Sequence, residues 1–202
     1  MTAHWFDGKT FRPNLLAQHI SGKIPFVCSP IDASGRGVKL WAYRGGVFQP
    51  DGESEARRLA HEALSEQSKP DRIQASVDLI KETVKIDESE LNPTAKELIN
   101  VENGMLDWQL GVLFPHLSEY HSTFQIRARF NPSVTYERVD RFLAEVFPPD
   151  AIPLVEELMG YLLLPSTDHQ KAFMLIGEGA NGKSALLKML SAFLGEGNVS
   201  NI

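Results

Sequence analysis

The stretch GEGANGKS, from Gly177 to Ser184, has residue types and spacing that could hold a phosphate. It satisfies G-x-x-x-x-G-K-[ST], the P-loop pattern, in which glycines let successive backbone N–H groups point at one anion. Lys183 is predicted to reach the β- and γ-phosphates of ATP, and the Ser184 hydroxyl to bind Mg²⁺, so these two carry the catalytic role. The predicted nucleotide contacts are Gly177, Glu178, Gly179, Ala180, Asn181, Gly182, Lys183, Ser184 and Ala185.

Two other motifs overlap the same glycines, because GEGANG also satisfies G-x-G-x-x-G. A protein-kinase loop would continue with a valine two residues later, whereas this loop continues with Lys183 and Ser184. A dinucleotide-binding fold needs a second strand ending in an acidic residue about 20 residues on. The residues GEGNVSNI that follow do not read as such a strand. The sequence therefore favours the P-loop.

A P-loop must be held between a strand and a helix. The run KAFMLI (171–176) is predicted to be that strand, and a helix is predicted to begin at about Lys183, where its dipole favours an anion. The helix carries an apolar stripe of Leu186, Leu187, Leu190, Phe193 and Leu194.

Nucleotide hydrolysis also needs an acidic residue at the end of a neighbouring strand, the Walker B position. The acids of PLVEE (153–157) lie in a helical pattern, and LINVE, ending at Glu102, precedes the loop, which is an unusual order. We therefore expect an ATPase core that begins here and is cut off. His116 and His121 lack a third metal ligand, so ordinary histidines are expected there.

Earlier parts of the chain predict a mixed α+β domain. Helices are expected at 14–20 and over 51–84, the latter with a break at Lys69-Pro70, and Gly45-Gly46 indicates a hairpin. Asn92-Pro93 is typical of a helix start.

A strand-rich stretch follows, with a turn at Asn103-Gly104. In FQIRARF (124–130) apolar residues alternate with polar ones, which places Arg127 and Arg129 on one face of a strand. That face is either solvated or a phosphate contact. Two helices are then expected, one from Thr135 to Phe147 and a largely buried one over 151–163, with a domain boundary near 165.

Composition narrows the function classes. The chain has 202 residues, a net charge of −6 and one cysteine, Cys28. Bulk electrostatic binding to DNA is disfavoured, because proteins that bind in this way are usually basic. One cysteine excludes an internal disulfide and indicates a reducing, cytoplasmic compartment. No apolar run approaches the ~18 residues of a membrane span, so no membrane partner is expected.

The order of these blocks resembles the phage and plasmid primase–helicase family, whose relatives include the poxvirus primase–helicase. The resemblance is carried by LINVENGMLDW, LFPHLSEYHSTFQIRARFNP, FLAEVF and VEELMGYLLLPSTDHQKAFMLIGEGANGKSALLKMLSAFLG. It implies a pre-helicase domain over 1–165, mainly helical with small antiparallel sheets or hairpins. It also implies that 166–202 begin an α/β, AAA+-like ATPase domain of a superfamily 3 helicase.

The resemblance further implies a replicative DNA helicase that uses ATP and Mg²⁺ as a homo-hexameric ring on single-stranded or forked DNA, with a primase as a possible partner. On this view the Walker B, sensor and arginine-finger residues would lie beyond Ile202. Two alternatives stay open. The chain could be another P-loop NTPase or a small-molecule kinase, although more than 170 residues precede the loop. Alone, it could also be a non-catalytic oligomerisation and DNA-loading module.

Overall fold

A computed structural model describes residues 5–31, 37–94, 96–164, 170–179 and 181–200. The chain divides into two compact units, which are described separately. Unit 1 comprises Met1–Pro93 and Leu117–Thr123, and unit 2 comprises Thr94–His116 and Phe124–Ile202. The expected boundary near 165 falls at residues outside those described, so the two-domain scheme built on it stays a prediction.

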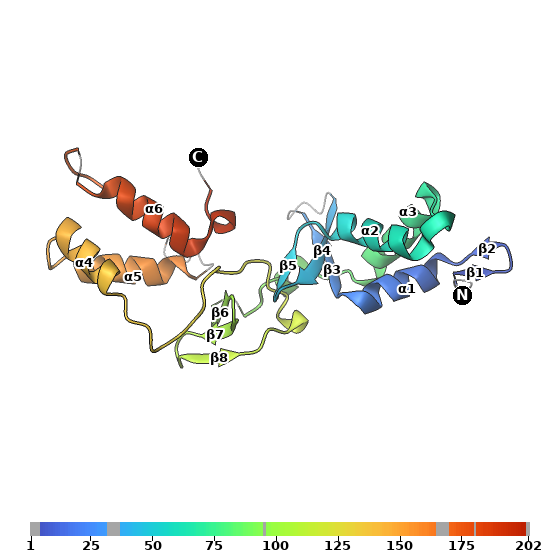
Figure 1. The fold of residues 1–202 in the computed structure, drawn as a ribbon, viewed down its shortest axis with the longest axis horizontal. Coiled ribbons are helices and arrows are strands. Elements are labelled where there is room, and N and C mark those ends of the chain that lie inside the picture. The colour runs from blue at the N-terminus through green and yellow to red at the C-terminus, as the bar shows by residue number, and fades with distance from the viewer. Residues whose placement is uncertain (1–4, 32–36, 95, 165–169, 180, 201–202) are drawn as a thin grey trace. The chain divides into compact units, whose positions relative to one another are not determined.

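Unit 1 joins three helices to a small sheet (Figure 1). Its elements are β1 (Phe6–Asp7), β2 (Thr10–Phe11), α1 (Pro13–Lys23), β3 (Phe26–Pro30), β4 (Val38–Arg44), β5 (Val47–Gln49), α2 (Gly52–Leu64), η1 (Ser65–Gln67), α3 (Pro70–Thr83), η2 (Glu88–Glu90) and η3 (Ser118–Tyr120). The sheet is antiparallel in the order β3-β4-β5. The predicted hairpin is confirmed, since Arg44 pairs with Val47 around Gly45-Gly46. The predicted helix break is confirmed as well, because α3 begins at Pro70.

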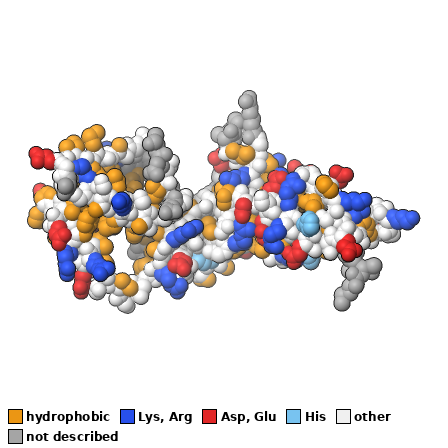
Figure 2. All heavy atoms as spheres, turned by 45° about the horizontal axis from the view of Figure 1, so that its top comes forward, with side chains coloured by type: hydrophobic (Ala, Val, Ile, Leu, Met, Phe, Trp, Pro, Cys, Tyr) orange, Lys and Arg blue, Asp and Glu red, His pale blue; other side chains and the backbone are white. Residues whose placement is uncertain are grey.

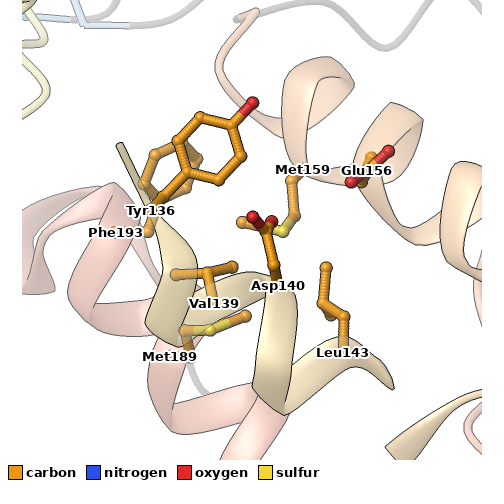
Figure 3. A pocket seen from close by; sticks show the side chains of 8 residues that line it. All are labelled: Tyr136, Val139, Asp140, Leu143, Glu156, Met159, Met189 and Phe193. Atoms are coloured by element: carbon orange, nitrogen blue, oxygen red, sulfur yellow. The ribbon is translucent and has the colours of Figure 1, made fainter. Parts of the chain in front are cut away.

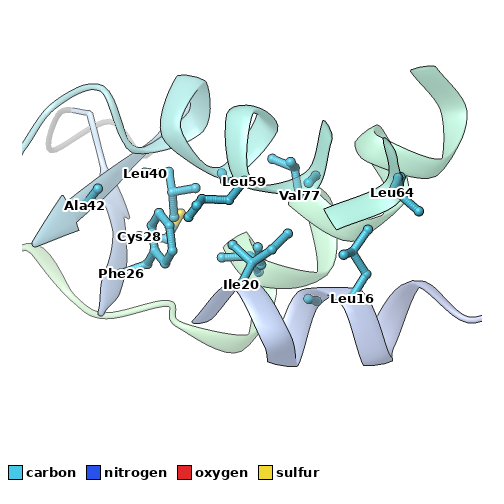
Figure 4. Close-up of a cluster of buried hydrophobic side chains, with 13 residues drawn as sticks. Leu16, Ile20, Phe26, Cys28, Leu40, Ala42, Leu59, Leu64 and Val77 are labelled. Carbon is cyan, nitrogen blue, oxygen red and sulfur yellow. The ribbon is translucent and has the colours of Figure 1, made fainter. Parts of the chain in front are cut away.

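The core of unit 1 lies between the sheet and the helices (Figure 4). Phe26, Cys28, Leu40 and Ala42 face it from the sheet, and Ile20 is fully buried on α1. The single thiol is therefore a core group, and burial raises the pKa of Cys28.

One sequence expectation in this unit is wrong. No helix begins at Asn92-Pro93, where the chain forms turns instead. The Asn92 carboxamide, expected to cap a helix, bonds to Thr123: its Oδ1 accepts the Thr123 N–H at 2.8 Å, and its Nδ2 donates to the hydroxyl at 2.9 Å. A partner 31 residues away therefore outcompetes the local cap.

Unit 2 combines a second antiparallel sheet with three helices. Its elements are β6 (Leu98–Val101), β7 (Gly104–Asp107), β8 (Val112–Phe114), α4 (Glu137–Val146), α5 (Ile152–Leu162), α6 (Lys183–Leu194) and η4 (Glu196–Asn198). The predicted turn is confirmed, because Val101 pairs with Gly104 across Asn103. Together the two units make an α+β fold with small antiparallel sheets and six α-helices among the described residues.

The segment 124–130 lies parallel to β6. The Ile126 N–H donates to the Asn100 carbonyl at 2.8 Å, and the Glu102 N–H donates to the Ala128 carbonyl at 2.9 Å. Ile126 is buried, whereas Arg127 and Arg129 are exposed, as the alternation predicted. The predicted strand itself is wrong, because only Ile126 forms a bridge and the residues around it are bends or irregular backbone. The Asn103 side chain extends the pairing, with Oδ1 accepting the Phe130 N–H and Nδ2 donating to its carbonyl.

The three helices of unit 2 share a small core of Leu143, Val155, Leu186 and Leu190. The prediction of a largely buried helix over 151–163 is wrong. Only Val155 of α5 is buried, and Leu154 is 56% exposed, because few described elements cover this helix. None of the described helices has the combined length and apolar character needed to span a membrane.

Candidate phosphate-binding loop

Helix α6 begins at Lys183, as predicted, and Gly182 is its N-cap. Gly182 has φ +85°, a left-handed conformation that favours glycine. A Cβ atom at this position would come within 2.7 Å of Val146 Cγ2 on α4. Both the backbone angle and the packing therefore require glycine where the loop turns into the helix.

The Lys183 ammonium group lies inside the loop. Its Nζ donates to the Gly177 carbonyl at 2.7 Å, to the Glu178 carbonyl at 2.9 Å and to Asn181 Oδ1 at 2.6 Å. A lysine has three ammonium hydrogens, so these contacts match its full donor capacity. The loop thus folds around its own cation at a helix N-terminus, where unpaired backbone N–H groups favour an anion.

Of the other predicted contacts, the described ones are exposed. Gly177, Glu178, Gly179 and Asn181 are exposed in the loop, and Ser184 and Ala185 are exposed in the first turn of α6. Ala180 lies outside the described residues. The sequence motif does not reveal that Asn181 bonds to Lys183, or that Val146 packs behind Gly182. The only hint in the sequence of the contact between Asn181 and Lys183 is that residue 181 has a side-chain amide, which can accept a hydrogen bond.

The strand predicted before the loop is absent from the described residues. Residues 171–176 are irregular, and Met174 and Ile176 are 82% and 85% exposed. A strand needs a hydrogen-bonded neighbour, and none of the described strands pairs with this segment. The apolar stripe of α6 is partly confirmed: Leu186 and Leu190 are buried, but Leu187 is 54% exposed.

The other chemical candidates resolve into structural roles. His116 Nε2 lies 3.1 Å from Asn100 Oδ1 and 2.9 Å from the Val101 carbonyl oxygen. His121 Nδ1 lies 3.0 Å from the Glu90 carbonyl oxygen. Within the part of the chain that the structure describes, no three His, Cys, Asp or Glu side chains are placed to hold a metal ion. PLVEE lies in α5, and Leu98–Val101 forms β6.

The chain is thus an α+β protein with a glycine-rich loop at the N-terminus of α6. A family model described as "D5 N terminal like" matches residues 14–148, which is more than half of the chain. The chain therefore belongs to this family, the N-terminal domain of D5-like primase–helicase proteins, and is a replication protein of the primase–helicase type. The match confirms the family resemblance, and it ends before the loop at 177–184. No curated protein matches the chain.

Proposed function

We propose that this chain is part of an ATP-dependent replicative DNA helicase and that its loop binds Mg·ATP. The observation that carries the proposal is the Lys183 ammonium group, held by three loop oxygens at the start of α6. A phosphate bound at this helix N-terminus would take the place of the neutral carbonyl and amide oxygens that now accept hydrogen bonds from Lys183. Its charged oxygens would bind the ammonium group more strongly.

The residues present fit the triphosphate. A Cβ atom at Gly177 would collide with the Asn181 side chain. Because glycine lacks that atom, the loop backbone can approach a phosphate closely. Lys183 supplies a positive charge, and the exposed Ser184 hydroxyl would hold Mg²⁺. The metal ion, when bound, would neutralise phosphate charge, while the backbone N–H groups of the first helical turn would orient the phosphates.

The segment 171–176 is consistent with a strand of a larger ATPase sheet. Most of its apolar side chains are exposed, and none of the described strands pairs with it, which suits a strand whose neighbours lie elsewhere. We propose that these neighbours, together with the Walker B acid, the sensor and the arginine finger, belong to chain not included in these 202 residues. In the assembled helicase, the ring would be a homo-hexamer acting on single-stranded or forked DNA, with a primase as a possible partner.

The first test is calorimetric titration of the chain with Mg·ATP. We expect binding that Lys183→Ala weakens at least tenfold, because charged hydrogen bonds contribute about 1.5–3 kcal/mol and 1.4 kcal/mol is a factor of ten. Lys188→Ala is the matched control, since Lys188 is exposed on the same helix. Equal affinities for the two variants would contradict the loop assignment.

Two further measurements separate this function from its alternatives. We expect the chain alone to bind Mg·ATP without turnover, since no described strand pairs with residues 171–176 to bring a Walker B acid beside the loop. Phosphate release that disappears in Lys183→Ala would instead favour a self-sufficient NTPase or small-molecule kinase. We also expect weak or no DNA binding at physiological salt, because the net charge is −6. Sub-micromolar DNA affinity would overturn that expectation and favour a DNA-loading module.

A further inference from the structure

A groove lies between α4, α5 and α6, with a volume of about 460 Å³ (Figure 3). Each helix contributes apolar side chains to it: Val139 and Leu143 from α4, Met159 from α5, and Met189 and Phe193 from α6. Their spacings of three or four residues place them on one face of each helix. We call this feature the three-helix groove. Its volume falls within the ~300–1,000 Å³ range of ligand pockets.

The rim of the three-helix groove is acidic. Asp140 from α4 and Glu156 from α5 line it, as does Tyr136, and both acidic residues are exposed. Figure 3 shows Asp140 rising from its helix among the apolar side chains. Across the described residues, neither carboxylate forms an ion pair. An anionic ligand would be repelled here, whereas a ligand with an apolar body and a positive charge would complement the site.

The groove is separate from the phosphate-binding loop. Met189 and Phe193 follow Lys183 by six and ten residues on α6, which corresponds to roughly 9 and 15 Å along the helix axis at 1.5 Å per residue. A phosphate at the N-terminus of α6 would lie beyond Lys183, farther still from the groove. The groove and the phosphate position therefore lie roughly two to three helical turns apart on α6.

We propose that the three-helix groove binds a basic amphipathic helix of a partner protein. Two helices, α4 and α6, each present a pair of apolar side chains to the groove and α5 adds Met159, which is a geometry that can receive the apolar face of a fourth helix. Two of the lining residues are methionines, whose flexible thioethers adapt to different apolar side chains. The carboxylates of Asp140 and Glu156 would attract lysine or arginine side chains that flank the apolar face of the partner helix, and would repel acidic ones.

The test uses two designed helical peptides with the same leucine face, one with lysines and one with glutamates on the polar face. The chain carries ¹³C-methyl methionine, and NMR spectra report each methionine separately. We expect the Leu–Lys peptide to shift the Met159 and Met189 signals. The signal of Met105, which is buried in β7, should stay in place. The Leu–Glu peptide should bind at least tenfold more weakly. This comparison requires no substitution in the chain.

A pair of variants then locates the charge. Asp140→Asn with Glu156→Gln should lower affinity for the Leu–Lys peptide at least tenfold. The matched control, Glu145→Gln with Glu157→Gln, changes two exposed acids on the same helices that do not line the groove, and should change affinity less than twofold. Equal binding of both peptides, equal loss in both variants, or shifts at Met105 would overturn the proposal. Concentration-dependent shifts of Met159 and Met189 without peptide would also overturn it, because they would assign the groove to a second copy of the chain.

Discussion

The two units differ in how they use their charged and apolar side chains. All ion pairs among the described residues lie in unit 1, and several link neighbouring elements, as Glu53 of α2 does with Lys81 of α3. Figure 2 shows both charge signs interspersed over α1, α2 and α3, whereas hydrophobic side chains gather over α4, α5 and α6. Most of the large exposed apolar side chains belong to unit 2, including Leu110, Met174 and Ile176. Contiguous exposed apolar patches mark interaction surfaces. Many charged side chains of unit 1 pair with one another, whereas unit 2 leaves more large apolar side chains exposed to solvent.

The largest expected effect is on the core of unit 1. Ile20→Ala should lower the free energy of unfolding by ~2–5 kcal/mol, because Ile20 is fully buried and its truncation leaves a cavity. Leu187→Ala is the matched change in unit 2 and should cost well under 1 kcal/mol, since Leu187 is 54% exposed. Urea unfolding followed by fluorescence in two single-tryptophan backgrounds, one that keeps Trp41 for unit 1 and one that keeps Trp108 for unit 2, measures both. Similar losses in the two variants would remove the contrast between the units.

An intermediate effect is expected at Gly182 and Gly45, two of the glycines with positive φ. Gly182→Ala combines a strained φ of +85° with a Cβ only 2.7 Å from Val146 Cγ2, whereas Gly45→Ala at φ +60° meets nothing within 4 Å. The left-handed conformation alone costs roughly 1–2 kcal/mol. We therefore expect Gly182→Ala to destabilise its unit by more than Gly45→Ala destabilises the other. If the alanine at 182 proves the milder change in urea unfolding, the packing of α4 against the loop is refuted.

The smallest effect is expected from the ion pairs of unit 1. Lys81 first, and then Arg57, lower the pKa of Glu53 through hydrogen bonds to its carboxylate. Because the folded-state pKa is lowered, the stabilising contribution is complete above the unfolded value near 4.3 and is lost as the pH falls through the folded value. At pH 7, Glu53→Gln should cost ~0.2–1 kcal/mol, the usual worth of solvent-exposed pairs.

The control for that measurement is Glu66→Gln, because Glu66 is exposed in η1 and forms no ion pair in the described structure. Stability is measured from pH 7 down to pH 3. The difference between the chain and Glu53→Gln should shrink on acidification, while Glu66→Gln should follow the unmodified chain throughout. A difference that stays constant with pH would show that the effect of Glu53 is not electrostatic.

Sequence reasoning predicted the features that depend on neighbouring residues. Gly45-Gly46, Lys69-Pro70 and Asn103-Gly104 mark turns or helix starts through backbone preferences that act locally, and the start of α6 at Lys183 follows from the motif itself. The role of residues 177–184 as a nucleotide site stays a prediction.

The failures concern contacts between residues distant in the sequence. Asn92 reads as a helix cap, yet its side chain bonds to Thr123. Residues 171–176 read as a strand, yet strand formation depends on a neighbour that sequence periodicity does not supply. At the site, the packing of Val146 against Gly182 joins two residues 36 positions apart, which no motif encodes.

The two hydrogen bonds between the Asn103 side chain and the Phe130 backbone also affect how readily Asn103 can deamidate. An asparagine followed by glycine deamidates readily, because the glycine nitrogen can attack the side-chain carbonyl carbon with little hindrance. Here both polar atoms of the carboxamide are held by the Phe130 backbone, so the folded chain restrains the group that would react. Deamidation to aspartate would replace the donor to the Phe130 carbonyl with a carboxylate oxygen and turn an attraction into a repulsion. The hydrogen bonds to Phe130 thus restrain a covalent change that would remove one of the contacts between the turn after β6 and residues 124–130.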